Sequence, residues 1–192
     1  MSRLNTKIKN MKHDLILEKA AEMFETEGFA EMKISQLAKT VGVSVGTIYS
    51  YFDSKEGLYS AWVLKEIEMA YTMLHKLSQE ELSAEAFIKH SIEIKFSMMA
   101  KKKRSLESGA LNNPFFFESQ QILHREALHK IYGLYIDIFD HIKEVDVESM
   151  QLVYILNALG NAYVMRWIEG EITDLEAKTD EVYTVFMKIL KG

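Results

Sequence analysis

Apolar residues recur at intervals of three and four along nearly the whole chain, and very little interrupts them. The 192 residues include one proline, Pro114, and nine glycines. Spacing of three and four places side chains on one face of an α-helix, whereas a half-buried strand shows strict alternation. No alternating segment is followed by an Asn-Gly or Asp-Gly turn. The sequence therefore predicts an all-α fold, and its apolar fraction of 48 % is large enough for a packed core.

The expected helices form a small N-terminal group and a larger C-terminal group. An apolar face that includes Phe24 defines the first helix, and Gly28 is expected to cap its end. A second short helix is expected around Leu37, a third after Ser44, and a long fourth helix continues to about Leu77. Later helices are expected over residues 84–103, 105–111, 115–143, 147–169 and 174–191, which makes about nine in all. We therefore predict a three-helix N-terminal domain over residues 1–53 and a helical bundle over residues 54–192.

Composition and spacing exclude or disfavour several function classes. The chain has no cysteine, which excludes disulfides, thiol nucleophiles and cysteine-ligated zinc. His124 and His129 are five residues apart and point to different helix faces, so no metal or cofactor site is predicted. No apolar block has the length of a signal peptide, or the roughly 18 residues of a membrane span. We therefore expect a cytoplasmic protein that does not associate with a membrane.

Charge is distributed unevenly along the chain. The net charge is −5, but residues 1–55 carry 8 Lys and Arg against 7 Asp and Glu, and the remainder carries 15 against 21. The first twelve residues contain no acid and four bases, Arg3, Lys7, Lys9 and Lys12. An acidic body with a basic leading arm indicates a polyanionic partner. A solvated N-terminal tail explains the same charges equally well.

One pentapeptide raises the question of an enzyme. Gly42-Val43-Ser44-Val45-Gly46 matches G-x-S-x-G, the nucleophile elbow of serine hydrolases. That elbow needs a strand before the serine and a sheet to carry it, whereas the preceding residues, ISQLAKT, have helical spacing. The sequence therefore predicts no catalytic residue, and hydrolysis by Ser44 is kept as an alternative.

A helix-turn-helix explains more of the same segment. Gly42 supplies the left-handed conformation that a tight turn between two steeply crossed helices requires. Ser44 is expected to cap the third helix, whose first N–H groups are then directed outward, where they attract phosphate. That helix carries hydroxyls rather than charges, and hydroxyls suit phosphate oxygens and groove edges. A helical interaction module that does not bind DNA is the second alternative.

The stretch from Ile16 to Trp62 resembles the DNA-binding region of the tetracycline-repressor (TetR) family. The residues that carry the resemblance are Ala20, Phe24, Gly28, Phe29, Ile34, Leu37-Ala38, Gly42-Val43-Ser44, Gly46-Thr47-Ile48-Tyr49, Tyr51-Phe52 and Lys55-Glu56. Beyond residue 62 the chain is similar to the family only in length and helical content. The resemblance implies a homodimeric transcriptional repressor that binds double-stranded DNA and whose C-terminal bundle binds a small-molecule effector.

The resemblance also implies which residues meet DNA. Val45 and Gly46 occupy the tip of the recognition helix, and Lys55 lies at a phosphate-contacting position. Relatives often carry a basic residue in place of Val45, so this valine is expected to meet a thymine methyl group instead. Lys33 takes the place of a capping hydroxyl and is expected to supply a phosphate contact. The predicted DNA-binding set is Lys33, Ser44, Val45, Gly46, Thr47, Tyr49, Ser50, Tyr51 and Lys55.

The C-terminal half contains candidates for the dimer seam and for the effector site. The last two helices carry small residues, Ala158, Gly160 and Ala162, and an apolar face from Val182 to Leu190, which suit a homodimer seam or an intramolecular core. Aromatic and methionine side chains, with two asparagines one turn apart, suit an apolar pocket with a few polar groups, although each is also typical of plain core. The predicted effector-binding residues are Phe96, Met99, Phe116, Tyr132, Tyr135, Tyr154, Asn157, Asn161 and Trp167.

Overall fold

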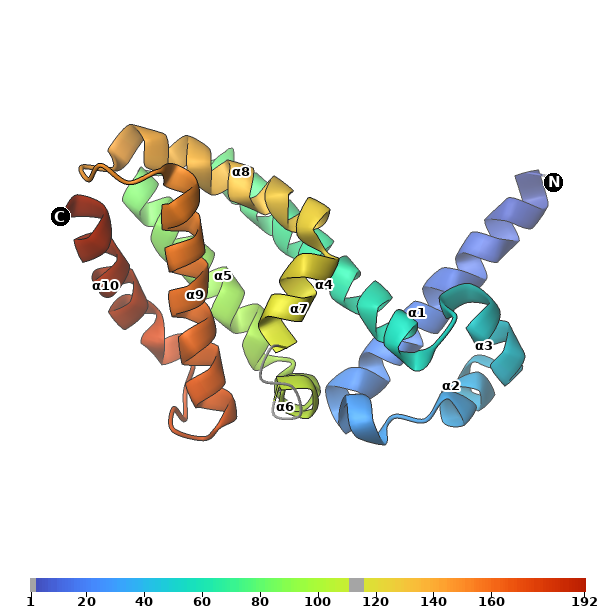
Figure 1. Ribbon diagram of the computed structural model, residues 1–192. Coiled ribbons are helices and arrows are strands. Elements are labelled where there is room, and N and C mark those ends of the chain that lie inside the picture. The colour runs from blue at the N-terminus through green and yellow to red at the C-terminus, as the bar shows by residue number, and fades with distance from the viewer. Residues whose placement is uncertain (1–2, 111–115) are drawn as a thin grey trace. The chain divides into compact units, whose positions relative to one another are not determined.

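The computed structural model describes residues 3–110 and 116–192, with the side chains of residues 108–110, 116–118 and 120 outside the description. Within these residues every regular element is helical, so the prediction of an all-α fold is confirmed (Figure 1). The elements are α1 (Arg3–Glu31), α2 (Ile34–Val41), α3 (Val45–Phe52), α4 (Lys55–Ser78), α5 (Ala84–Ala100), α6 (Lys103–Ala110), α7 (Phe116–Leu123), α8 (Arg125–Ile142), α9 (Ser149–Ile168), the 3-10 turn η1 (Glu176–Lys178) and α10 (Thr179–Lys191).

Two boundaries differ from the expectation. The single helix predicted over residues 115–143 is two helices, α7 and α8, which meet at the buried His124, where φ is −110° and ψ is 25°. No proline or glycine marks this break, so the described residues contain ten α-helices rather than about nine. At Gly28 the backbone leaves helical geometry, with φ 83° and ψ 165°, and one further turn carries α1 to Glu31.

The described chain divides into two compact units. The N-terminal unit comprises residues 3–66 and 104–110, and the C-terminal unit comprises residues 67–103 and 116–192. The division therefore passes through α4, and α6 belongs with the N-terminal unit although the sequence places it after α5.

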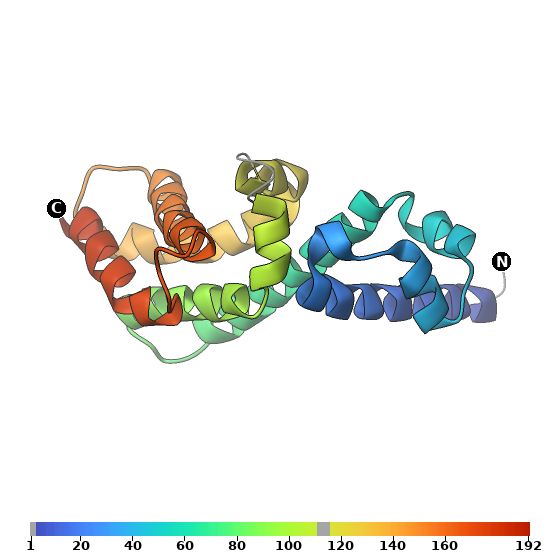
Figure 2. The same ribbon diagram turned by 90° about the horizontal axis from the view of Figure 1, so that it is seen from below.

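The N-terminal unit is built on α1, against which α2 packs, with α3 packed in turn on α2 (Figure 2). Its interior contains a cluster of aromatic rings from α1 and α4. Phe24 meets Tyr59 edge-on with centroids 5.1 Å apart, and Trp62 lies 5.5 Å from the same Phe24 ring. The buried Ser105 of α6 donates a hydrogen bond of 3.3 Å to the Tyr59 hydroxyl, which joins α6 to this cluster. The fully buried aliphatic side chains are Ile16, Leu37, Ile48 and Leu58.

The C-terminal unit is a helical bundle in which α9 packs against α8, α5 and α10 (Figure 1). Five buried side chains fill its centre: Phe87, Phe96, Phe139, Leu152 and Phe186. Along α10 the apolar residues divide between two faces. Val182, Phe186 and Leu190 are buried in the bundle, whereas Val185 and Ile189 are exposed. No helix of the described residues is both long and apolar enough to cross a membrane.

Candidate nucleic-acid interface and interior polar cluster

The turn between α2 and α3 depends on the backbone conformation of Gly42. Its φ of 75° and ψ of 36° lie in the left-handed region, and its N–H donates to the carbonyl of Ala38. The N–H of Val43 donates to the same carbonyl at 2.9 Å. A Cβ atom built on Gly42 would meet nothing within 4 Å, so the dihedral angle, rather than lack of space, favours glycine here. The predicted turn is confirmed.

Ser44 caps α3. Its φ of −77° and ψ of 154° are extended, and its Oγ accepts a hydrogen bond of 3.0 Å from the N–H of Thr47. The hydroxyls of Ser44 and Thr47 lie 2.8 Å apart. The part of the chain that the structure describes has no strand before this serine, so the nucleophile-elbow pattern has none of the context that it needs. Ser44 is a helix cap in a helix-turn-helix.

The eight residues of α3 separate into an inner and an outer face. Ile48 and Phe52 are buried and hold the helix against the rest of the N-terminal unit. Val45 and Tyr49 are 38 % and 41 % exposed, although large hydrophobic and aromatic side chains are usually buried. Gly46 and Ser50 are exposed as well, and Thr47 and Tyr51 are half-buried. The predicted DNA-contacting residues of α3 therefore form an outward surface with hydroxyl and methyl groups.

The basic N-terminal segment is helical and lies beside α3. Residues 3–12 form the first turns of α1 and are all exposed. The Nζ atom of Lys9 is 6.0 Å from the centroid of the Tyr51 ring, and the His13 ring stacks on Phe52 at 4.8 Å. The segment is thus an exposed helix, and Lys9 lies beside the Tyr51 ring of α3. Nothing in the sequence spacing had indicated the stacking of His13.

Lys33 and Lys55 have different surroundings. Lys33 precedes α2 with an extended backbone, makes no side-chain cap, and is exposed. The loss of the cap is as predicted, and the adjacent Met32 is buried. Lys55 Nζ donates to the carbonyl oxygen of Ala30 at 3.2 Å and lies 4.7 Å from the centroid of the Phe29 ring. Lys55 therefore joins the start of α4 to the end of α1, and its ammonium retains hydrogens for a second acceptor.

An interior polar cluster in the C-terminal unit contains the two predicted asparagines. Lys95 of α5 reaches α9, where its Nζ donates to Asn157 Oδ1 at 2.8 Å, Asn161 Oδ1 at 2.8 Å and the Asn157 carbonyl oxygen at 3.3 Å. Burial lowers the pKa of Lys95 from its ordinary value to about 8, because the charged form is poorly solvated there. Sequence reasoning did not select Lys95. Its only signal is a charge on the apolar face of α5 defined by Ile88, Ile92 and Met99.

Two tyrosines among the predicted effector-binding residues lie on α8. The hydroxyl of Tyr135 hydrogen-bonds with Ser91, and burial raises the pKa of this phenol to about 12. The Tyr135 ring meets Phe87 at 5.6 Å. Tyr132 is buried and meets the half-exposed ring of Tyr154 edge-on at 5.9 Å, and burial raises the pKa of Tyr132 as well.

The remaining predicted effector-binding residues are dispersed. Phe96 and Trp167 are buried, with Lys103 Nζ 4.9 Å from the centroid of the Trp167 ring, and Met99 is half-buried. The side chain of Phe116 lies outside the described residues. The structure therefore brings Asn157 and Asn161 together through Lys95, and Tyr132 together with Tyr154.

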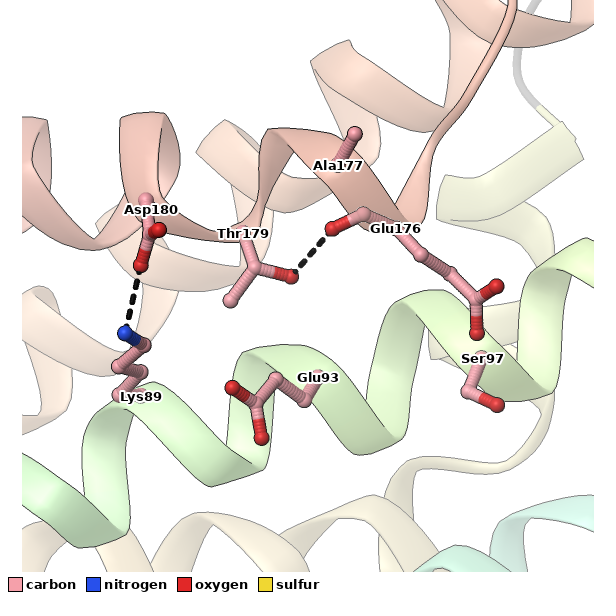
Figure 3. Close-up of a pocket in the computed structure, with 7 residues that line it drawn as sticks. All are labelled: Lys89, Glu93, Ser97, Glu176, Ala177, Thr179 and Asp180. Carbon is pink, nitrogen blue, oxygen red and sulfur yellow. Dashed lines mark hydrogen bonds and ion pairs between the residues drawn. The ribbon is translucent and has the colours of Figure 1, made fainter.

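A surface pocket of about 290 Å³ lies between α5 and the segment from η1 to α10 (Figure 3). It is crossed at one end by an ion pair between Lys89 and Asp180, with 2.6 Å between Nζ and Oδ1. None of the predicted effector-binding residues lines it. Its other lining residues are Glu93, Ser97, Glu176, Ala177 and Thr179.

Comparisons with known proteins agree with this geometry. Residues 16–62 match the family model for bacterial regulatory proteins of the tetR family. The fatty acid metabolism regulator protein of Bacillus subtilis (strain 168) is 23 % identical over 146 residues, which are 76 % of this chain and 73 % of that protein.

Solved structures have the same fold over nearly the whole chain. The fatty acid degradation regulator FadR from Bacillus halodurans superposes with a TM-score of 0.72 at 20 % identity, covering 91 % of this chain and 94 % of the other. FadR from Bacillus subtilis, crystallised in complex with stearoyl-CoA, has a TM-score of 0.71 at 18 % identity, covering 90 % and 96 %. Residues 16–62 therefore carry the DNA-binding region of the tetR family of bacterial regulatory proteins, and the chain has the fold of the solved FadR regulators.

Proposed function

We propose that this protein is a ligand-responsive repressor that binds a near-palindromic operator as a homodimer. The observation that carries the proposal is the capped helix α3, which presents Val45 and Tyr49 outward while Ile48 and Phe52 anchor it. Hydroxyl groups and free N–H groups at a helix start suit phosphate oxygens. The valine side chain suits a thymine methyl group in the major groove.

A second copy of the chain is part of the proposal because one short recognition helix reads only a few base pairs. Two helices in successive major grooves, about 34–36 Å apart, read two half-sites and increase specificity. The exposed stripe of α9, which contains Ile155, Ala158 and Ala162, supports a seam there. Val185 and Ile189 supply an exposed apolar row on α10. Small residues permit close approach of helices, and paired apolar stripes exclude water.

The seam is tested by placing a charge within it. Ile155→Glu is expected to convert the dimer into a monomer, since an unpaired carboxylate is poorly tolerated in an apolar interface. Leu82→Glu is the matched control, because both side chains are 37 % exposed and Leu82 lies in the connection between α4 and α5. Sedimentation velocity on both variants decides the matter. A dimeric Ile155→Glu protein, or a monomeric wild type, contradicts the proposed seam.

The effector is proposed to be an amphiphile with an acyl chain, bound within the C-terminal unit. Support comes from the fold shared with a FadR protein crystallised with stearoyl-CoA. Further support comes from the interior of this unit, which is rich in aromatic side chains and includes Met98 and Met99 on α5. Methionine side chains adapt readily to a ligand because they are unbranched and polarizable.

Regulation is proposed to work by differential binding. The effector is proposed to fit the bundle better in a conformation in which the two recognition helices have the wrong spacing for DNA. Effector binding then lowers the affinity for DNA, and DNA binding lowers the affinity for the effector by the same factor. The helix α4 is the proposed coupling element because Lys55–Ser78 is one continuous helix that contributes to both units.

The proposal is tested by selecting random DNA duplexes on the full-length protein, followed by fluorescence anisotropy with the enriched sequence. The expected result is an inverted repeat whose affinity falls steeply with salt and falls again when stearoyl-CoA is added. Failure to enrich any sequence refutes the repressor function and favours a helical interaction module. Equal DNA affinity with and without stearoyl-CoA refutes regulation by that acyl-CoA.

A further inference from the structure

The interior polar cluster formed by Lys95, Asn157 and Asn161 contains a positive charge without a negative partner. All three acceptors of the Lys95 ammonium are neutral amide oxygens, at 2.8, 2.8 and 3.3 Å. Among the described residues no carboxylate pairs with Lys95. The neighbouring residues on the two helices, Ile92, Phe96 and Leu156, are buried and apolar. A cation at such a place is expensive unless it is paired.

A glycine on α9 keeps room for this lysine. A Cβ atom at Gly160 would lie 3.0 Å from Lys95 Nζ and 3.3 Å from its Cε, which is tighter than nine in ten real Cβ contacts, so the end of Lys95 would have to move. Glycine in the middle of a helix is destabilising relative to alanine. Two features that are each destabilising therefore meet where α5 contacts α9: a cation without a carboxylate partner and a glycine in the middle of a helix. Perturbed groups of this kind concentrate at functional sites.

The groups around Lys95 can also turn their donors toward an anion. Each asparagine amide carries an NH₂ group as well as the oxygen that now accepts from Lys95, so rotation of the amide offers two more donors. Ser91 lies one turn before Lys95 on the same face of α5, and it holds the hydroxyl of Tyr135.

We propose that Lys95, with Asn157 and Asn161, binds the anionic head group of the effector, and that this group is a carboxylate or a phosphate joined to an apolar chain. The inference rests on the proposed function, since it assigns a binding group to the effector site of the C-terminal unit. An anion supplies the missing countercharge, and its oxygens replace the amide oxygens as acceptors of the Lys95 hydrogens. The apolar chain of the same molecule packs among the aromatic and methionine side chains of the bundle.

The head group is tested with three probes of one chain length. Isothermal titration of the full-length protein uses laurate, lauroyl-CoA and 1-dodecanol, which present a carboxylate, phosphates and a neutral hydroxyl. At least one anionic probe is expected to bind the wild type about tenfold or more tightly than 1-dodecanol, since a charged hydrogen bond is replaced by a neutral one. Lys95→Met is expected to remove about tenfold or more of that affinity and to leave the 1-dodecanol affinity within about twofold. The probe whose affinity falls identifies the head group as carboxylate or phosphate.

A second pair of variants keeps the test decisive if Lys95→Met does not fold. Gly160→Ala displaces the end of Lys95 and is expected to weaken the anionic probe selectively. Gly133→Ala is the matched control on α8, where an added Cβ meets nothing within 4 Å, and it is expected to bind every probe as the wild type does. Unchanged anionic affinity in both Lys95→Met and Gly160→Ala, or a wild type that binds neither anionic probe, overturns the inference. DNA affinity measured without any probe tests the repressor function separately.

Discussion

The strongest single prediction concerns how the free energy of unfolding depends on pH through Lys95. Folding moves this ammonium from water to a partly buried position where its hydrogen-bond acceptors are amide oxygens, and its pKa falls from 10.5 to about 8. Between these two pH values the unfolded chain keeps a proton on the lysine that the folded chain has released. Because the unfolded state binds more protons in that window, the free energy of unfolding rises as the pH increases.

The size of the effect follows from the same pair of values. At 1.36 kcal/mol for each pKa unit, a fall from 10.5 to about 8 corresponds to a total of about 3 kcal/mol. Most of this free energy is regained between pH 7 and pH 10. Because solvent reaches the partly buried side chain and weakens the effect, we expect the free energy of unfolding to rise by about 2 kcal/mol over that range. Lys95→Met removes the titrating group while preserving an unbranched chain, and the gain is expected to disappear with it.

The assay is urea denaturation of wild type and Lys95→Met at pH 7, 8.5 and 10, at one fixed protein concentration so that any dimerisation contributes equally. Other groups titrate at high pH. The pKa of Tyr135, for example, is raised to about 12, so stability is lost above pH 10 as the unfolded tyrosine releases its proton first. Such contributions are common to both proteins, and the difference between their pH profiles isolates Lys95.

Two results would refute this reasoning. If the profiles of wild type and Lys95→Met run parallel within about 0.5 kcal/mol, Lys95 is not desolvated in the folded protein. If Lys95→Met loses about 3 kcal/mol or more at pH 7, the lysine stabilises the contact between α5 and α9 on balance, and the charge is not a net burden.

Three further predictions concern the N-terminal unit. Gly42→Ala is expected to lower the free energy of unfolding by about 1–2 kcal/mol because of the left-handed φ at this position. The control Gly133→Ala, at an open helical position on α8, is expected to be neutral or to stabilise the protein by up to about 1 kcal/mol. Thermal denaturation compares the two variants. Replacing both Lys7 and Lys12 with glutamine is expected to reduce the slope of log affinity for DNA against log salt by up to about two, and an unchanged slope would mean that the start of α1 does not reach phosphate. Tyr49→Phe removes one exposed hydroxyl and is expected to weaken operator binding by about three- to tenfold in anisotropy titrations; an equal loss on unrelated DNA would place that hydroxyl on a phosphate rather than on a base.

The helix-turn-helix was predictable because its determinants are local. The conformation of Gly42 and the cap from Ser44 to Thr47 each involve residues fewer than six positions apart. Backbone preferences and helix periodicity report such short-range features directly. The break at His124 was not predictable in the same way, because neither a proline nor a glycine accompanies it.

The interior polar cluster shows where sequence reasoning stopped. Asn157 and Asn161 stood out as polar residues on an apolar helix. Their partner Lys95 is 62 and 66 residues away, and no spacing rule connects positions so distant. Lysine is also a residue type that is almost always exposed, so the sequence alone suggests that Lys95 lies at the surface. Only the packing of α5 against α9 reveals that this lysine points inward.

The position of α6 affects how regulators of this kind can be recombined. Its residues Ser105 and Leu106 are buried with the N-terminal unit, and Ser105 hydrogen-bonds to Tyr59, although 46 positions separate these two residues in the chain. A chimera that grafts residues 1–66 onto a foreign bundle would carry Tyr59 without the segment that covers it. Exchange of operator specificity between two such proteins therefore requires two pieces of chain to be transplanted together.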